Sequence, residues 1–173
     1  MQGTISSDSA QPAKRKSPLP NNPFRDCWPL RTFSETKHLP FSAHDLYEIV
    51  IDVDRYDEFL PWCVASRVRE CRDDGTLIAD LSIGYGSLRE KFTSHVTADP
   101  DTLTVETRQY SGPFRHLQSN WYLEADEQGG TIVSFEIEFE FRSILLENLI
   151  GAVFEAAARK MISAFEARAA RLV

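Results

Sequence analysis

The amino-acid sequence predicts one α+β domain, in which an antiparallel sheet packs against a long C-terminal helix. Three observations lead to this prediction. Turn signals recur at short intervals through the middle of the chain, the runs between them alternate apolar and polar residues, and the C-terminal segment has the apolar pattern of a long helix. With 173 residues, the chain is long enough to bury its own core without disulfides or metal ions.

The composition limits the classes of partner. Residues 1–31 carry five basic and two acidic residues, whereas the rest of the chain carries 14 basic and 24 acidic residues. An acidic domain repels phosphate backbones, and no cluster of Lys and Arg interleaved with aromatic residues offsets this, so nucleic acid is not expected as a partner. No segment approaches the ~20 apolar residues that a membrane-spanning helix requires. The three cysteines indicate neither a disulfide framework nor a zinc site.

Residues 1–31 are expected to form a flexible N-terminal extension. They contain five of the nine prolines and too few apolar residues to build a core of their own. Their basic cluster, Lys14-Arg15-Lys16, weakly resembles a mitochondrial targeting segment, and an ordinary flexible tail is the equally weighted alternative. A secretory signal is not expected, because no apolar core follows the basic residues. The folded domain is predicted to span residues 32–173.

A short strand and a helix are the first elements expected. Residues 33–39 read as a strand, and a proline follows them. Ser42 and the acidic Asp45 three positions later form a capping box, so a helix is predicted to begin there. Apolar side chains then recur at helical spacing over residues 46–53, before a loop that contains a proline breaks the helix.

Strands joined by tight turns are predicted to fill the middle of the domain. Turn signals occur at residues 73–75, 99–101 and 127–130, each between two strand-like runs. The last run, residues 133–141, has Val, Phe and Ile at alternate positions, with Ser and Glu between them. The pattern predicts an antiparallel meander with one buried face and one face in water.

A long helix is predicted for residues 143–171, with a length of about 43 Å if it is continuous at 1.5 Å per residue. The first half of this segment is apolar over more than one stripe, which is more apolar surface than contact with one sheet needs. Gly151 lies inside the helix at a cost of about 1 kcal/mol relative to alanine. Its presence predicts either a kink or a close neighbour.

Catalytic and cofactor motifs are missing from the sequence. There is no Gly-x-Ser-x-Gly elbow, and residues 84–87 lack the third glycine of a dinucleotide fingerprint. The acidic residues 52–57 depart from a calcium loop, because Asp57 occupies the glycine position. The four histidines show no metal-binding spacing. Neither a catalytic cofactor nor a metal centre is predicted.

Several blocks of the sequence together resemble the coenzyme Q-binding family of START-like domains. Their order along the chain makes the set specific, and the resemblance covers residues 32–173. It implies a helix-grip fold, in which a curved antiparallel sheet wraps the long C-terminal helix and encloses an apolar cavity. The blocks are Asp-Val-Asp-Arg-Tyr-Asp-Glu-Phe-Leu-Pro-Trp-Cys at 52–63, Leu-Arg-Glu-Lys-Phe-Thr-Ser at 88–94, Gly-Pro-Phe-Arg at 112–115, Phe-Glu-Ile-Glu-Phe-Glu-Phe-Arg-Ser-Ile-Leu-Leu at 135–146 and Phe-Glu-Ala-Arg-Ala at 165–169.

The resemblance also implies a function. The family is associated with binding ubiquinone or its polyprenyl precursors in support of respiratory electron transport and quinone biosynthesis, and it has no known catalytic residue. We therefore expect a non-catalytic lipid chaperone whose bound ligand is ubiquinone or a related isoprenoid quinone. Peripheral contact with a membrane and with quinone-biosynthesis proteins is implied as well. The N-terminal extension favours the matrix side of the mitochondrial inner membrane if the source is eukaryotic, and the alternative is the bacterial cytoplasm.

Candidate lipid-binding residues come from the predicted inner faces of the sheet and the helix. Removing apolar surface from water gains about 25 cal/mol per Å², so a long groove can hold a polyprenyl chain without covalent chemistry. The alternative for each candidate is a packing role in the core. Trp62 is expected to edge the opening, with a packing contact as its own alternative. The other candidates are Leu81, Ile83, Tyr85, Phe92, Trp121, Phe135 and Phe139 on the sheet, and Leu145, Leu149, Val153 and Met161 on the helix.

Two other functions stay open at this point. A cyclase-like enzyme would hold a reactive chain in the same cavity, as related helix-grip folds do, and would need acids, bases or tyrosines that point inward. Tyr85 and His95 are the nearest candidates, but strand alternation puts His95 on the face opposite Phe92. The third reading is a protein-interaction module, because a bacterial branch that resembles this family is described as acting on ribosome association.

Overall fold

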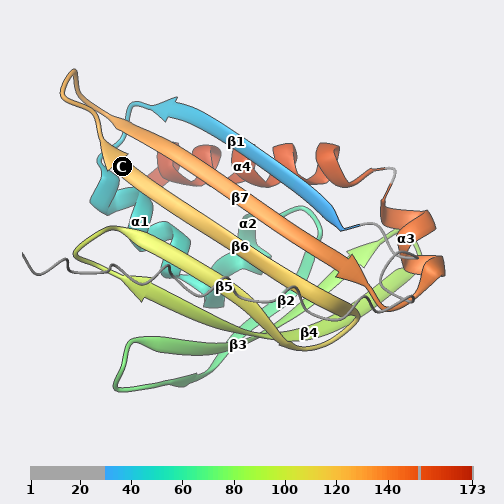
Figure 1. The fold of residues 1–173 in the computed structure, drawn as a ribbon. Helices are drawn as coiled ribbons and strands as arrows, with labels where there is room; N and C mark the ends of the chain where they lie inside the picture. The colour runs from blue at the N-terminus through green and yellow to red at the C-terminus, as the bar shows by residue number, and fades with distance from the viewer. Residues whose placement is uncertain (1–29, 152, 173) are drawn as a thin grey trace, which may run out of the picture.

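A computed structural model of the chain describes residues 30–151 and 153–172, so the predicted extension, residues 1–31, lies almost wholly outside the described part. The described residues form a seven-stranded antiparallel sheet in the order β1-β7-β6-β5-β4-β3-β2. The chain runs as a meander from β2 to β7, and β1 joins it at the β7 edge (Figure 1). The strands are β1 (Arg31–Leu39), β2 (Cys63–Cys71), β3 (Thr76–Tyr85), β4 (Leu88–Asp99), β5 (Thr104–Ser111), β6 (Phe114–Ala125) and β7 (Thr131–Phe141).

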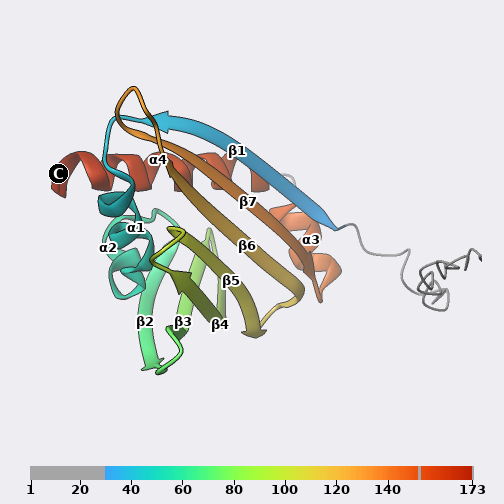
Figure 2. The same ribbon diagram turned by 60° about the vertical axis from the view of Figure 1, so that its left-hand side comes forward.

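The helices cover the concave side of this sheet. Figure 2 shows the sheet curving around α4, with α1 and α2 at one end of the fold and α3 at the other. This arrangement confirms the predicted helix-grip fold. None of the helices in the described ranges has both the length and the hydropathy needed to cross a bilayer. The helical elements are α1 (Ala43–Ile51), the 3-10 turn η2 (Val53–Arg55), α2 (Tyr56–Phe59), α3 (Ile144–Ile150) and α4 (Phe154–Leu172).

The predicted start of α1 is confirmed in detail. The Ser42 hydroxyl accepts a hydrogen bond from the Asp45 backbone N–H at 3.1 Å, which satisfies one of the free donors of the first helical turn. The same hydroxyl donates to the Asp45 carboxylate at 2.6 Å. A Ser and an Asp three positions apart therefore fix where the helix begins.

The three predicted turns are also confirmed, and two more were not predicted. They lie at Gly86-Ser87, between β3 and β4, and at Gly112-Pro113, between β5 and β6. Gly112 has a φ of +142°, and a Cβ atom there would lie 2.4 Å from the Cβ of Phe92. Glycine is therefore required at a turn that packs directly against a side chain on the inner face of the sheet.

Two helices take the place of the single helix predicted for residues 143–171, and the interruption lies between Ile150 and Phe154, beside Gly151, where a kink or a close neighbour was predicted. Arg31 Nε donates to the carboxylate of the buried Glu147 at 2.7 Å, so an ion pair lies against the end of α3. A Cβ atom on Gly151 would lie 2.7 Å from the Arg31 guanidinium and 2.5 Å from the Glu147 carbonyl oxygen. The glycine therefore permits the ion pair to pack against the backbone where α3 ends.

The two faces of β7 give a direct test of the sheet register. Phe139 is only 1% exposed, whereas Glu138 accepts from His116 at 2.7 Å on the outer face. We expect Phe139→Asp to unfold the protein, since losing a buried Phe side chain alone costs about 3–5 kcal/mol and a buried charge adds to this. Glu138→Ala should cost less than about 1 kcal/mol, because it removes only one polar contact on the outer face. Thermal melts check both variants, and equal destabilisation would contradict the register.

Candidate functional site

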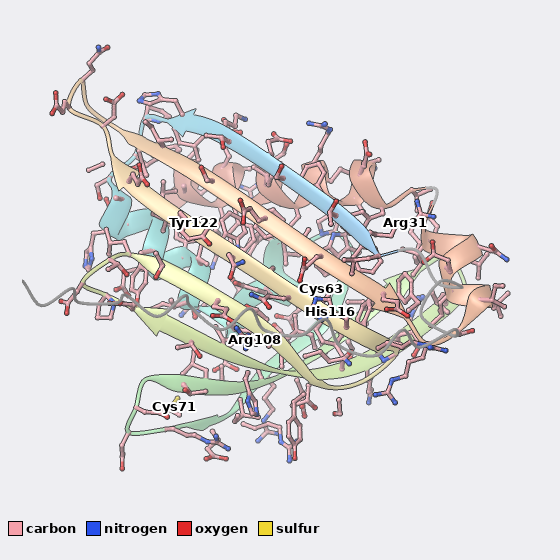
Figure 3. All side chains as sticks on the ribbon, in the orientation of Figure 1. Arg31, Cys63, Cys71, Arg108, His116 and Tyr122 are labelled. Atoms are coloured by element: carbon pink, nitrogen blue, oxygen red, sulfur yellow. The ribbon has the colours of Figure 1, made fainter. Side chains whose placement is uncertain are left out.

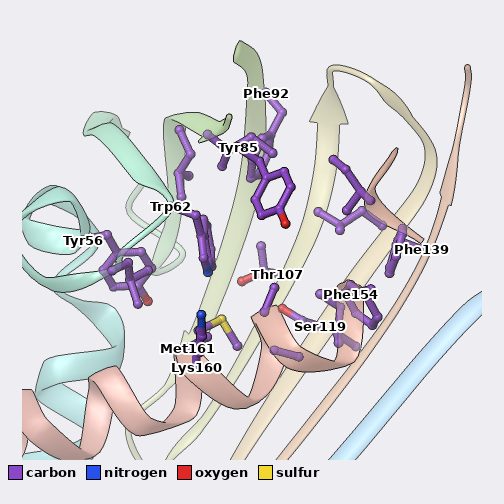
Figure 4. A pocket seen from close by; sticks show the side chains of 18 of the residues that line it. Tyr56, Trp62, Tyr85, Phe92, Thr107, Ser119, Phe139, Phe154, Lys160 and Met161 are labelled. Atoms are coloured by element: carbon purple, nitrogen blue, oxygen red, sulfur yellow. The ribbon is translucent and has the colours of Figure 1, made fainter. Parts of the chain in front are cut away.

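A cavity of about 570 Å³ lies between the concave face of the sheet and α4 (Figure 4). Its volume falls within the range of ~300–1,000 Å³ that is typical of small-molecule sites. The walls come from β3 to β7, from the segment around α2, and from the first half of α4. The cavity is mostly apolar, because most of its lining residues are aromatic or aliphatic.

Two aromatic side chains hold α4 against the rest of the fold. Phe154, at the start of the helix, packs on Phe139 with 4.3 Å between ring centroids. Phe165, three turns later, packs on Trp121 at 4.9 Å and on Phe59 at 5.0 Å. These contacts fix the distance of the helix from the sheet at both ends of the cavity.

Between these two contacts, the part of α4 that faces the cavity carries mostly small or flexible side chains. Ala157, Ala158 and Met161 line the cavity there. Alanine fills little of the space that the two aromatic contacts hold open, and methionine adapts to irregular volumes. Small side chains between large ones therefore account for a cavity at a position where a packed core would otherwise form.

The cavity is closed at one end and open at the other. Trp121 and Phe135 are buried at its inner end. Tyr85, in contrast, is 55% exposed, and the neighbouring Gly86 and the helical Lys160 are exposed as well. The opening therefore lies between the β3–β4 hairpin and the first half of α4, with Tyr85 projecting over it (Figure 4).

Most of the residues proposed from the sequence come together in this cavity. Ten of them line it, namely Trp62, Leu81, Ile83, Tyr85, Phe92, Trp121, Phe135, Phe139, Val153 and Met161. Their contact with a ligand stays a prediction. The placement of Leu145 and Leu149 on the cavity wall is wrong, because they are 63% and 49% exposed on α3. The break at Gly151 turns α3 away from the line of α4, so Leu145 and Leu149 face outward, whereas Leu146 is buried and Ile150 lines the cavity.

Sequence reasoning missed the polar part of the lining. Ser94, Thr107 and Ser119 lie on three neighbouring strands and all contribute to the cavity wall. Strand alternation gave a signal for them, since Ser94 lies between Phe92 and Val96 on the inner face of β4. The sequence-based prediction names only apolar positions of that alternation and therefore does not include these hydroxyls.

Two buried polar atoms of the lining have no hydrogen-bond partner among the described residues. They are the hydroxyl oxygen of Ser94 and the indole N–H of Trp62. The phenol of Tyr56, by comparison, donates to the Val50 carbonyl oxygen at 2.5 Å. Burial, followed by the charge of Asp52, raises the pKa of Tyr56 well above its ordinary value. Tyr56 therefore stays protonated and hydrogen-bonded, whereas Ser94 and Trp62 are available to a ligand.

The outer face of the sheet carries mostly polar side chains. Figure 3 shows Arg108, His116 and Tyr122 on the side of the sheet away from α4. His95 also lies outside the cavity lining, stacked on Tyr110 with 4.9 Å between ring centroids. Tyr85 and His95 therefore do not meet in one site. Over residues 30–151 and 153–172, no group of three or more His, Cys, Asp or Glu side chains could hold a metal ion.

Comparison with known proteins identifies relatives over most of the chain. The family described as "Polyketide cyclase / dehydrase and lipid transport" matches residues 39–166. The ribosome association toxin RatA of Rickettsia prowazekii is 37% identical over 145 residues, which cover 82% of this chain and 98% of that protein. The mitochondrial coenzyme Q-binding protein COQ10 homolog B of Xenopus laevis is 32% identical over 143 residues, which cover 81% of this chain and 58% of that protein.

Solved structures agree with the sequence relatives. An 18 kDa protein from Caulobacter crescentus superposes with a TM-score of 0.69 at 38% identity, covering 82% of this chain and 97% of that one. A START superfamily protein from Mycobacterium smegmatis gives a TM-score of 0.71 at 16% identity, covering 82% and 99%, and this second match shows the fold alone. The resemblance stated from the sequence blocks is confirmed.

The two cysteines of the described region should differ sharply in reactivity. Burial, followed by the nearby carboxylate of Asp57, raises the pKa of Cys63 to about 11, whereas Cys71 is exposed. The reactive thiolate of Cys63 therefore becomes abundant only as the pH approaches that value. In a Cys27→Ser background, we expect iodoacetamide at mildly alkaline pH to modify Cys71 and to spare Cys63, as judged by peptide mass spectrometry. Both should react in denaturant, and equal rates in the folded protein would contradict the burial of Cys63.

Proposed function

The chain belongs to the polyketide cyclase/dehydrase and lipid transport family, and we propose that it binds an isoprenoid quinone such as ubiquinone, or a polyprenyl precursor of one, without catalysis. The observation that carries the proposal is the cavity between α4 and the sheet, which is apolar and opens beside Tyr85. A long apolar chain gains about 25 cal/mol for each Å² of surface that leaves water there. The relative that is named as a coenzyme Q-binding protein supports a quinone as the ligand.

The chemistry of the lining favours binding over catalysis. The cavity wall in the described part of the chain contains no Asp, Glu, His or Cys side chain. General acid–base catalysis uses such a group, or a Lys or Tyr, within hydrogen-bonding reach of the substrate. Lys160, the Lys of the described wall, is exposed at the opening. The Tyr56 hydroxyl already donates its proton to the Val50 carbonyl oxygen in a hydrogen bond, and Tyr85 lies exposed at the opening. We therefore favour a lipid chaperone in respiration and quinone synthesis over the cyclase-like alternative.

An exposed apolar surface beside the opening suits exchange of such a ligand with a membrane. Ile144, Leu145 and Leu149 on α3 are 65%, 63% and 49% exposed. On the same side, Ile150 and Val153 line the cavity, so apolar surface continues from α3 into the interior. A bilayer would cover the exposed leucines and receive the ligand at the same place.

The charges of the molecule favour an anionic bilayer at this end. The α3 end of the sheet is where β1, β4 and β6 begin, and its cations are Arg31, Arg89, Lys91, Arg115 and Arg142. They outnumber its carboxylates, which are Glu90, Glu140, Glu147 and Glu155. The three turns at the opposite end carry Asp73, Asp74, Asp99, Asp101, Asp126 and Glu127. A negative surface therefore attracts the end with the opening and repels the other.

The proposed function implies a location in the cell. A eukaryotic source would put the protein on the matrix side of the mitochondrial inner membrane, where quinone-biosynthesis proteins are further candidate partners. A bacterial source would put it in the cytoplasm, as expected from the bacterial relatives named RatA.

Ribosome association is the second candidate function. It is supported by the relative of 37% identity, which is named as a ribosome association toxin. The acidic balance of the domain speaks against contact with RNA, but a ribosomal protein surface could still be the partner. Co-sedimentation of the purified protein with bacterial ribosomal subunits in a sucrose gradient tests this. A stoichiometric complex that persists at raised salt would support ribosome association, and its absence would leave lipid binding as the better account.

Ligand binding can be tested by filling the cavity. We expect the delipidated protein to bind one short-chain ubiquinone per chain, measured by calorimetry and by mass spectrometry of the organic extract. Ala157→Phe should abolish binding while the protein stays folded, because a ring at position 157 occupies the space between the two aromatic contacts of α4. Ala170→Phe, on an exposed position of the same helix, is the matched control. Retained binding in Ala157→Phe, or extraction of phospholipid alone, would contradict the proposal.

Membrane docking can be tested separately from ligand binding. We expect the protein to co-sediment with vesicles of phosphatidylcholine and phosphatidylglycerol, and the binding to weaken with salt. Leu145→Ser with Leu149→Ser should weaken vesicle binding by about tenfold or more, because two leucines no longer enter the bilayer. Quinone binding in detergent should be unchanged in this variant, since neither residue lines the cavity. Leu172→Ser removes a leucine of similar exposure at the far end of α4 and should have no effect.

A further inference from the structure

Three hydroxyl side chains form a row across the sheet inside the cavity. Thr107 on β5 is directly paired with Ser119 on β6. Ser94 on β4 is paired with Gln109, two residues from Thr107 on the same face of β5, so Ser94 and Thr107 are diagonal neighbours. Figure 4 shows Thr107 and Ser119 facing the cavity below Tyr85. The rest of the wall around this hydroxyl row is aromatic or aliphatic, apart from Lys160 at the opening.

The hydroxyl row lacks partners of its own. Ser94 is fully buried, and its hydroxyl makes no hydrogen bond within the described chain. Thr107 and Ser119 are half-buried, and within the described chain their hydroxyls make no hydrogen bond either. Buried hydroxyls in proteins normally find a partner, because an unpaired one loses its hydration without compensation. A polar group inside the cavity would supply what these side chains lack.

The hydroxyl row lies deep in the cavity. Ser94 follows Leu88, at the opening, by six residues of β4, a distance of about 20 Å at ~3.4 Å per residue. Its inner-face neighbour along the strand, Val96, is buried, as is Trp121, two residues from Ser119. If one end of a ligand reached these hydroxyls, the rest of the ligand would lie along the apolar wall toward Trp62 and Tyr85, at the opening.

We propose that the hydroxyl row is the head-group site of the cavity. The oxygen-bearing ring of the ligand sits on Ser94, Thr107 and Ser119, and the polyprenyl tail runs back toward the opening. This inference rests on the proposed function and adds the direction in which the ligand lies. It also assigns the ligand class: an apolar chain that carries hydrogen-bonding oxygen atoms at one end.

The hydroxyl row should accept both redox forms of such a ring. A Ser or Thr hydroxyl can donate to a quinone carbonyl, and it can equally accept from the hydroxyl of the reduced quinol. The indole N–H of Trp62, by contrast, can only donate. Trp62 belongs to the opening, since its carbonyl oxygen accepts from Gly84 N at 2.9 Å. A head group held at Trp62 would therefore be oriented the opposite way and would favour the oxidised form.

The test compares a ligand that has a head group with one that lacks it. The combined variant Ser94→Ala, Thr107→Val and Ser119→Ala is titrated with short-chain ubiquinone and with squalene, a polyprenyl hydrocarbon without oxygen. We expect its affinity for ubiquinone to fall by about tenfold or more and its affinity for squalene to change by less than about twofold, because only the head group loses hydrogen bonds. Ser134→Ala, which removes a hydroxyl from the outer face, is the matched control.

Melting temperatures and a tryptophan variant separate this site from a packing effect. The combined variant should melt no lower than the wild type, because Ser94→Ala removes an unpaired buried hydroxyl. Unchanged ubiquinone affinity, or an equal loss for ubiquinone and squalene, would overturn the head-group site. Loss of ubiquinone binding in Trp62→Phe with no loss in the combined variant would also overturn it and put the head at the opening. Failure of the wild type to bind either compound would overturn the proposed function and this inference with it.

Discussion

The contact of α4 with the sheet through two aromatic side chains is the constraint on which the site depends. Phe154 and Phe165 hold the helix at a set distance, and the alanines between them do not fill the gap. Beyond Phe165, Ala169 is fully buried and the helix packs closely. One helix therefore serves as core element in its second half and as the wall of a ligand cavity in its first half.

The sequence predicted the fold and the buried face of the sheet well, because strand alternation has a period that no other element shares. The sequence did not predict the burial of Glu147 at the end of the sheet. Its carboxylate pairs there with Arg31, 116 residues away in the chain. Such a partner leaves no local pattern. Helical periodicity also could not tell an apolar side chain that faces the interior from one that faces outward, so Leu145 and Leu149 were assigned to the wrong surface.

Strand alternation alone could have placed the three polar lining residues on the inner face, but predicting that they are neighbours also requires the strand register. Ser94, Thr107 and Ser119 each occupy an inward position on their own strand, and only the pairing of β4 with β5 and β5 with β6 makes them neighbours. The fold by itself does not choose between a lipid carrier, a cyclase and a ribosome partner. What distinguishes these functions is the chemistry of a few side chains inside one cavity and on one end of the surface.

The walls of the cavity come from segments spread over most of the described chain, so the cavity exists only when the whole domain is folded. Any molecule that fills it binds the native state and not the unfolded chain, and it raises the free energy of unfolding of the entire domain. The empty protein is accordingly the more readily unfolded form, and a protease that cleaves unfolded chains would remove it first. Ligand supply would in this way regulate how long each molecule survives.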